Sequence, residues 1–320
     1  MITQSTSVGG SRILQVLVQK LHPYLSQDIN EIQFNGAKMM YLVKGSSYEK
    51  VQEDLFDERF LMNFCEQLAN SRNLFFNLQV PHLSCSIPHT RYRVNALHPS
   101  ITAQNKLALC IRIPNESKFP IQAFKLGDKV QDKGISYEDI LNLVIEAKNI
   151  LVSGGTASGK TSFVNSLIEK IPLDERVITI EDSPELHLKN PNLVSILVGK
   201  NEDSNYSYET ALNDAMRMSP QRLLLGEIDT KNVSLFLRLA NTGHSGMIST
   251  LHSNSVQDAI FAINLNIKIG SKKDIDSKDL LDFFVRGMDN IIQIKKIGNE
   301  RVIEDVLNVK KDLKKLLADI

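Results

Sequence analysis

Residues 149–161 read NILVSGGTASGKT, a short apolar run that leads into a glycine-rich loop. The loop itself, GGTASGKT at residues 154–161, matches the pattern G-x-x-x-x-G-K-[ST]. Its glycines allow successive backbone amides to point inward at phosphate oxygens, and the helix that follows presents the positive end of its dipole to the same anion. Because the match falls between an expected strand and an expected helix, we predict a nucleotide phosphate site here.

The residues of this loop have expected roles in binding phosphate and Mg²⁺. Lys160 reaches the outer phosphates as a point charge, and the hydroxyl of Thr161 can ligate Mg²⁺. The expected nucleotide-binding residues of the loop are Gly154, Gly155, Thr156, Ala157, Ser158, Gly159, Lys160, Thr161 and Ser162. The motif alone does not distinguish an ATPase motor from a small-molecule kinase or a GTPase.

Outward from the loop, apolar runs alternate with helical stretches. The expected strands are NILVS, RVITI, RLLLG and GMIST, and the expected helices cover residues 136–145, 161–171, 208–218 and 231–242. Such alternation predicts an α/β fold with a mostly parallel sheet covered by helices. The tail NIIQIKKIGNERVIEDVLNV predicts a hairpin that turns at Gly298-Asn299.

Three of these strands end in groups that suit phosphate hydrolysis, at the sheet edge where ligands of α/β proteins bind. Glu227 follows RLLLG, and we expect it to position the attacking water. Glu181 ends RVITI, and we expect it to shape the shell of Mg²⁺ and water, with Asp182 as its rival. His252 follows GMIST and could sense the γ-phosphate. The alternatives are that Asp182 caps a turn and that His252 is a polar contact in a loop.

The first 113 residues predict a separate, smaller α+β domain. Helical spacing covers residues 13–21 and 58–73, and INEIQFN, MMYLVK, RYRVNAL and LALCIRI have the character of strands. A polar stretch punctuated by proline and glycine then predicts an interdomain linker at 114–135, which leaves 136–320 for the second domain.

Composition excludes several other classes of protein. The 37 basic residues balance 37 acidic ones, which disfavours nucleic acid as the primary ligand. The three cysteines are odd in number and widely spaced, with no secretory signal before them, so we expect reduced thiols in a cytoplasmic protein. His82, Cys85 and His89 have metal-like spacing without an evident fourth ligand, so no zinc is expected. No run approaches the ~18 apolar residues of a membrane span, so we expect any membrane contact to be peripheral.

Four segments, GGTASGKT, VITIEDSPEL, RLLLGE and TGHSGMISTLHS, together resemble a known family. In this order they are similar to the Walker A, Asp-box, Walker B and His-box segments of the secretion ATPase superfamily. Within it, the hexameric traffic ATPases of bacterial type IV secretion systems are the most similar. INEIQFNG, YRVNAL and LCIRIP resemble that family's N-terminal domain, so the likeness covers most of residues 28–310.

The resemblance implies a RecA-like ATPase domain that binds ATP or ADP with Mg²⁺. It also implies a homo-hexamer that works with other secretion-system components at the cytoplasmic face of the inner membrane. The family's N-terminal domain offers arginines to the phosphates, and the matching positions here are Arg93 and Arg112. The glycine before Glu227 is characteristic of that family's Walker B segment.

The chain also departs from this family's pattern. The family usually has arginine at the position of Asp229 and often has arginine at the position of Ser219. These departures put the rate of hydrolysis in doubt. A scaffold that binds nucleotide with little hydrolysis therefore stays open as an alternative. So does a pilus or type II secretion motor of the same superfamily, although the tetracysteine segments of many such motors are absent from this sequence.

Overall fold

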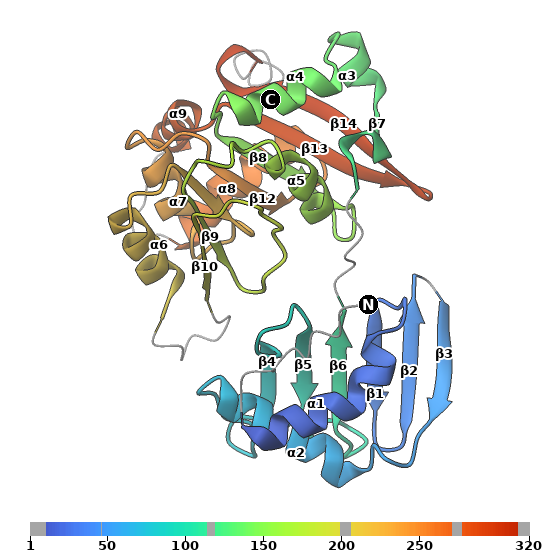
Figure 1. The fold of residues 1–320 in the computed structure, drawn as a ribbon. Coiled ribbons are helices and arrows are strands. Elements are labelled where there is room, and N and C mark those ends of the chain that lie inside the picture. The colour runs from blue at the N-terminus through green and yellow to red at the C-terminus, as the bar shows by residue number, and fades with distance from the viewer. Residues whose placement is uncertain (1–10, 46, 114–118, 199–205, 271–276, 313–320) are drawn as a thin grey trace. The chain divides into compact units, whose positions relative to one another are not determined.

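The computed structural model describes residues 11–45, 47–113, 119–198, 206–270 and 277–312, and the structural statements below concern those residues. They fall into two compact units, one up to residue 113 and the other from residue 119 onward, and each unit has its own core (Figure 1). In the described residues, no helix combines the length and the apolar character that crossing a bilayer requires.

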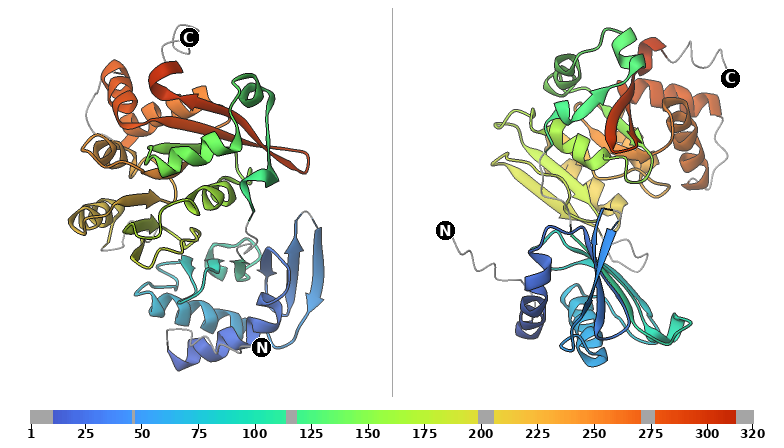
Figure 2. Two further views of the ribbon diagram at one scale, coloured as in Figure 1. Left: turned by 45° about the horizontal axis from the view of Figure 1, so that its top comes forward. Right: turned by 90° about the vertical axis from the view of Figure 1, so that its right-hand side faces the viewer.

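Unit 1 is an antiparallel sheet with two helices packed on one face (Figure 2). The strand order is β3-β2-β1-β6-β5-β4. The elements are α1 (Arg12–Leu25), β1 (Glu31–Asn35), β2 (Met39–Lys44), β3 (Ser47–Gln52), α2 (Glu58–Ser71), β4 (His82–Ser86), β5 (Arg93–Leu97), the 3₁₀ helix η1 (Pro99–Ile101) and β6 (Ala108–Arg112).

The core of unit 1 follows from two periodicities in the sequence. Every second residue of β1 is buried, as at Ile32 and Phe34, so one face of the sheet is apolar. Helices α1 and α2 cover that face with apolar stripes, and Asp57 caps α2 by accepting a hydrogen bond from the amide of Phe60 (2.7 Å).

Unit 2 is built on an eight-stranded sheet of order β10-β9-β11-β12-β8-β13-β14-β7. The strands are β7 (Phe124–Leu126), β8 (Ile150–Gly154), β9 (Val177–Glu181), β10 (Leu193–Leu197), β11 (Arg222–Leu225), β12 (Ile248–His252), β13 (Asn290–Ile297) and β14 (Glu300–Asn308). Neighbours from β10 to β13 are parallel, whereas β13 and β14 form an antiparallel hairpin.

Helices cover both faces of this sheet (Figures 1 and 2). They are η2 (Ile121–Ala123), α3 (Asp128–Asp132), α4 (Tyr137–Ile145), α5 (Lys160–Ile168), α6 (Tyr208–Arg217), α7 (Val233–Ala240), α8 (Val256–Gly270) and α9 (Ser277–Gly287). Successive residues of β8 point to opposite faces: Leu151 joins one core, while Ile150 and Val152 join the other. Burial on both faces explains why these strands read as continuous apolar runs.

The predicted α/β class with a mostly parallel sheet is confirmed, and so is the hairpin turning at Gly298. The stretch expected as a linker, residues 114–135, contributes to unit 2 from Ile121 onward, because β7 pairs with β14 and α3 packs nearby. Its residues 114–118 lie outside the described residues. The functional boundary between two domains stays a prediction.

Candidate functional site

The predicted phosphate loop connects the end of β8 to the start of α5. Gly159 precedes the helix in the left-handed conformation (φ 98°), which favours glycine. A Cβ at Gly154 would lie 2.5 Å from the carbonyl oxygen of Ile294 and 2.6 Å from Oγ of Ser158. Both glycines are therefore required by the shape of the loop.

Two other residues of the loop, Ala157 and Ser158, have energetically unfavourable features. Ala157 adopts a left-handed conformation (φ 59°) that costs a residue with a side chain about 1 kcal/mol. The hydroxyl of Ser158 is buried and makes no hydrogen bond within the described structure. Such features are common where a backbone is shaped for a ligand.

Lys160 is buried at the mouth of this loop. Its Nζ donates hydrogen bonds to the carbonyl oxygens of Gly154 (2.8 Å) and Gly155 (3.0 Å) and lies 3.1 Å from Nδ1 of His252. Burial lowers the pKa of Lys160, while the charge of Glu227 acts in the opposite direction. The ammonium group is thus already directed at the inside of the loop.

His252 and Glu227 extend this contact into a chain of three side chains. Nε2 of His252 lies 2.9 Å from Oε1 of Glu227, and both side chains are about half exposed. The chain forms because β12 lies between β8 and β11 in the sheet, with His252 directly opposite Gly154. Three sequence-predicted residues therefore form a chain of contacts beside the phosphate loop: Lys160 at the start of α5, His252 at the end of β12 and Glu227 just after β11.

Glu181 lies at the end of β9, and its side chain is buried. Its Oε1 accepts hydrogen bonds from the amides of Glu185 (2.8 Å) and Leu186 (2.9 Å). A Cβ at Gly226 would lie 3.3 Å from Cγ of Glu181. The glycine before Glu227 thus makes room for a second carboxylate at the neighbouring strand end.

Tyr208, at the start of α6, is a residue that the sequence analysis did not single out. Burial raises the pKa of Tyr208, and the charges of Asp182, Asp229, Glu227 and Glu181 raise it further. This tyrosine therefore faces the acidic edge of the sheet. The sequence around Tyr208 contains no motif that would mark it as a site residue, because only the packing of α6 brings it to the acidic edge.

Asp229, the main departure from the resemblance, has a local structural role. Its Oδ1 accepts hydrogen bonds from the amides of Lys231 (2.8 Å) and Asn232 (3.2 Å), ahead of α7. Asn232 in turn donates from Nδ2 to the carbonyl oxygen of Glu227 (2.9 Å). The carboxylate of Asp229 is therefore occupied in the turn that follows Glu227.

Arg222, on β11, is a structural residue. Its buried guanidinium pairs with Glu175 and donates to the carbonyl oxygen of Val144 (2.9 Å). A Cβ at Gly246 would collide with the same guanidinium, which explains a glycine at that point. Arg217 is exposed at the end of α6, and Ser219 follows in the left-handed conformation (φ 52°).

Arg93 and Arg112 both belong to unit 1. They lie directly opposite each other on β5 and β6, and Arg112 is exposed. The phosphate loop belongs to unit 2, so the contact of either arginine with a nucleotide stays a prediction.

The expected Mg²⁺ donors are a hydroxyl and a carboxylate. Thr161 lies half-buried in the first turn of α5, and Glu181 ends β9, which β11 and β12 separate from β8 in the sheet. The described part of the chain has no group of three His, Cys, Asp or Glu side chains arranged around a metal. Mg²⁺ at nucleotide sites needs no such group, since it takes one or two protein ligands and completes its shell with phosphate oxygens and water.

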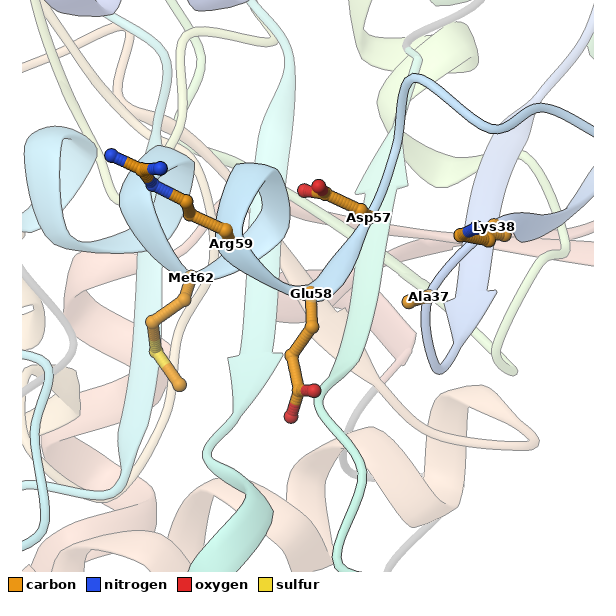
Figure 3. A pocket seen from close by; sticks show the side chains of 6 residues that line it. All are labelled: Ala37, Lys38, Asp57, Glu58, Arg59 and Met62. Carbon is orange, nitrogen blue, oxygen red and sulfur yellow. The ribbon is translucent and has the colours of Figure 1, made fainter.

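A pocket of about 620 Å³ also occurs in unit 1 (Figure 3). It is lined by residues of the β1–β2 turn and the start of α2, namely Ala37, Lys38, Asp57, Glu58, Arg59 and Met62. Lys38 pairs with Asp54 (3.2 Å), and Asp57 caps α2. Two of its charged groups, Lys38 and Asp57, thus have structural partners, and none of the lining residues was predicted as a site residue.

Comparisons with known sequences indicate a family. Residues 79–274 match the family model described as type II/IV secretion system protein. The type IV secretion system protein VirB11 of Bartonella henselae is 27% identical, with 95% of this chain and 96% of that protein aligned. PtlH of Bordetella pertussis, also a type IV secretion system protein, is 31% identical over 78% of this chain and 80% of its own.

Solved structures share the fold. The VirB11 ATPase of Brucella suis, in complex with sulphate, has a TM-score of 0.51 at 22% identity, covering 94% of this chain and 97% of that chain. The pilus retraction motor PilT with bound ADP has a TM-score of 0.64 at 20% identity, covering 96% and 88%. The ATPase DotB of Legionella pneumophila also has a TM-score of 0.64, at 14% identity, covering 96% and 83%.

Proposed function

Because the chain belongs to the type II/IV secretion system protein family, we propose that it is a Mg²⁺-dependent ATPase that powers a bacterial type IV secretion machine. Its relatives VirB11 and PtlH are type IV secretion system proteins, which favours that machine over a pilus or type II system. The observation that carries the enzymatic part is the contact of Lys160, His252 and Glu227 beside the phosphate loop.

In this proposal the loop amides and the start of α5 bind the phosphates of ATP. Lys160 exchanges its carbonyl partners, Gly154 and Gly155, for phosphate oxygens, which relieves the cost of its buried charge. Thr161, with help from Glu181, would hold Mg²⁺, and the ion would supply positive charge to the phosphate oxygens.

Glu227 orients the attacking water and accepts its proton in this scheme. His252 fixes the Glu227 carboxylate through its Nε2 and contacts Lys160 through its Nδ1, so it links the water-activating group to the phosphate-binding group. Orientation of both groups before ATP arrives lowers the cost of assembling the transition state.

We further propose that the active form is a homo-hexamer at the cytoplasmic face of the inner membrane, in contact with other components of the secretion system. Arg93 and Arg112 are proposed to read the phosphates from unit 1. A cation supplied by a separate unit would couple the state of the nucleotide to the position of that unit.

Phosphate release by the purified protein tests the enzymatic proposal. Glu227→Gln keeps the size of the side chain but removes the proton acceptor, so we expect its turnover to fall by about 10²–10⁴-fold. ADP affinity should change little, whereas Lys160→Ala should lose it. Equal turnover in wild type and Glu227→Gln would reject the ATPase and leave a nucleotide-binding scaffold.

A further inference from the structure

A second cation reaches the phosphate loop from the C-terminal hairpin. A Cβ at Gly159 would lie 2.8 Å from both Cδ and Nε of Arg301, so the arginine stem packs directly on the last glycine of the loop. This contact depends on Gly159, since any side chain there would displace Arg301.

Strand register explains how the hairpin arrives at this point. β13 runs parallel to β8 and pairs with it up to Ile294 opposite Gly154, where the phosphate loop begins. β13 then continues to Ile297, and β14 brings Arg301 back towards the loop, opposite Lys296 on β13 and Phe124 on β7. The end of the hairpin therefore extends past the strand end that supports the loop.

Aromatic groups hold the Arg301 side chain in this position. Its Cζ lies 4.6 Å from the ring centroid of Phe119, and Phe124 approaches Gly159 from the same side. Phe124 is itself fixed by an edge-to-face contact with Phe163 of α5 (centroids 5.0 Å apart). Stacking of this kind sets the plane of a guanidinium without using its N–H donors.

Those donors have no acceptor within the described part of the chain: the Arg301 guanidinium makes neither a hydrogen bond nor an ion pair there. Two other cations near the hairpin differ, because Lys125 pairs with Glu300 and Lys295 pairs with Glu304 (2.8 Å). A half-buried guanidinium with five N–H donors therefore lies beside a loop shaped for anions.

We propose that Arg301 is a further nucleotide-binding residue, whose guanidinium contacts the phosphates that ATP and ADP share. This inference rests on the proposed nucleotide site and adds a residue to it. Phosphate is the ligand whose charge and geometry match an unpaired guanidinium. Since the contact is made with both nucleotides, Arg301 contributes to binding and not to the chemical step.

Competition against a fluorescent ADP analogue measures this contribution. Arg301→Gln retains much of the stem on Gly159 and Phe119 but removes the charge. Lys296→Gln is the matched control, because it removes an exposed charge from the position directly opposite on the same hairpin. Loss of one charge-assisted contact predicts about tenfold weaker binding of both ADP and inorganic pyrophosphate in Arg301→Gln, and wild-type binding in Lys296→Gln.

The controls separate this inference from the proposed function. Wild-type and Lys160→Ala proteins that bind the ADP analogue equally would reject the nucleotide site itself. With that site intact, the assignment of Arg301 is overturned if pyrophosphate fails to compete in the wild type, or competes equally in wild type and Arg301→Gln. If Arg301→Gln unfolds at a lower temperature than the wild type, Arg301→Lys provides the second measurement. An intermediate affinity is expected for it, because lysine keeps the charge but not the planar donors.

Discussion

Gly226 and Lys160 show how single residues set the chemistry of this site. Many P-loop enzymes have a magnesium-holding aspartate where this chain has Gly226. We propose the corresponding function for Glu181 on the adjacent strand, whose Cγ would lie 3.3 Å from a Cβ at 226. The glycine and the buried glutamate are therefore two parts of one arrangement.

Replacing Gly226 with aspartate should destabilise the protein. The new carboxylate would lie beside the buried Glu181, and two like charges there should cost about 1–3 kcal/mol in the free energy of unfolding. Urea titration at pH 7.5 measures this, with Gly226→Ala as the control for size alone. An aspartate variant as stable as the alanine variant at pH 7.5 would contradict the argument.

Lys160 predicts a pH dependence of nucleotide binding. Burial lowers its pKa from the ordinary 10.5, so its positive charge is present below the lowered pKa and is lost as pH rises through that value. ADP affinity should therefore begin to fall at a pH below the pKa of an ordinary lysine. Calorimetry in buffers of different ionisation enthalpy should also detect proton uptake on binding.

The same shift affects folding with a definite sign. Between the lowered pKa of Lys160 and 10.5 the unfolded chain binds more protons than the folded one, so this group makes the apo protein more stable as pH rises through that window. An ADP affinity that stays constant up to the pKa of an ordinary lysine would contradict both expectations.

At the scale of elements, the turn between β11 and α7 holds Glu227 in place. Asp229 accepts two amide hydrogen bonds there, and Asn232 fixes the carbonyl oxygen of Glu227. An aspartate in this position is therefore compatible with a nearby anion, because its charge is partly satisfied by backbone donors.

Asp229→Ala should lose the two amide hydrogen bonds of this turn and destabilise the protein by about 0.5–1.5 kcal/mol, the net contribution of a typical intramolecular hydrogen bond. Thermal unfolding measures this loss, and Asp229→Asn should recover most of it because the amide oxygen still accepts. Turnover should fall less than in Glu227→Gln. A variant with native stability but no turnover would show that Asp229 has a chemical role and not a structural one.

For the whole molecule, the proposed function requires that unit 1 affect hydrolysis in unit 2. Arg112 is exposed on β6 of unit 1, and the resemblance assigns it to the phosphates. If it stabilises the transferring phosphoryl group, its removal should slow hydrolysis by up to about 10³–10⁵-fold.

Arg112→Ala should accordingly reduce turnover far more than ADP affinity. Steady-state phosphate release and ADP titration on the same sample measure the two effects, and solution mass with and without nucleotide tests the proposed hexamer. Lys50→Ala, which removes an exposed cation from the edge strand β3 of the same sheet, is the control. Equal losses of turnover and ADP affinity would mean that Arg112 does not read the γ-phosphate.

Several structural features could be predicted from short stretches of sequence. The glycines of the phosphate loop, the apolar runs of β8, β9 and β11, and the turn at Gly298 all appear in the structure where the sequence indicated them. The edge strands β3, β7 and β10 were not predicted, because β3 is mostly polar, β7 has only three residues and the LVSIL of β10 lacks the alternation of a half-buried strand.

The sequence by itself determined the α/β class and the phosphate loop, since these depend on side-chain spacing and backbone freedom within a few residues. Only the tertiary structure decided that Lys160, His252 and Glu227 touch, that Glu181 fits against Gly226 and that Arg301 packs on Gly159. Those contacts join residues up to 142 positions apart, from Gly159 to Arg301. They depend on strand order and register, which the packing of the whole sheet fixes and no local pattern encodes.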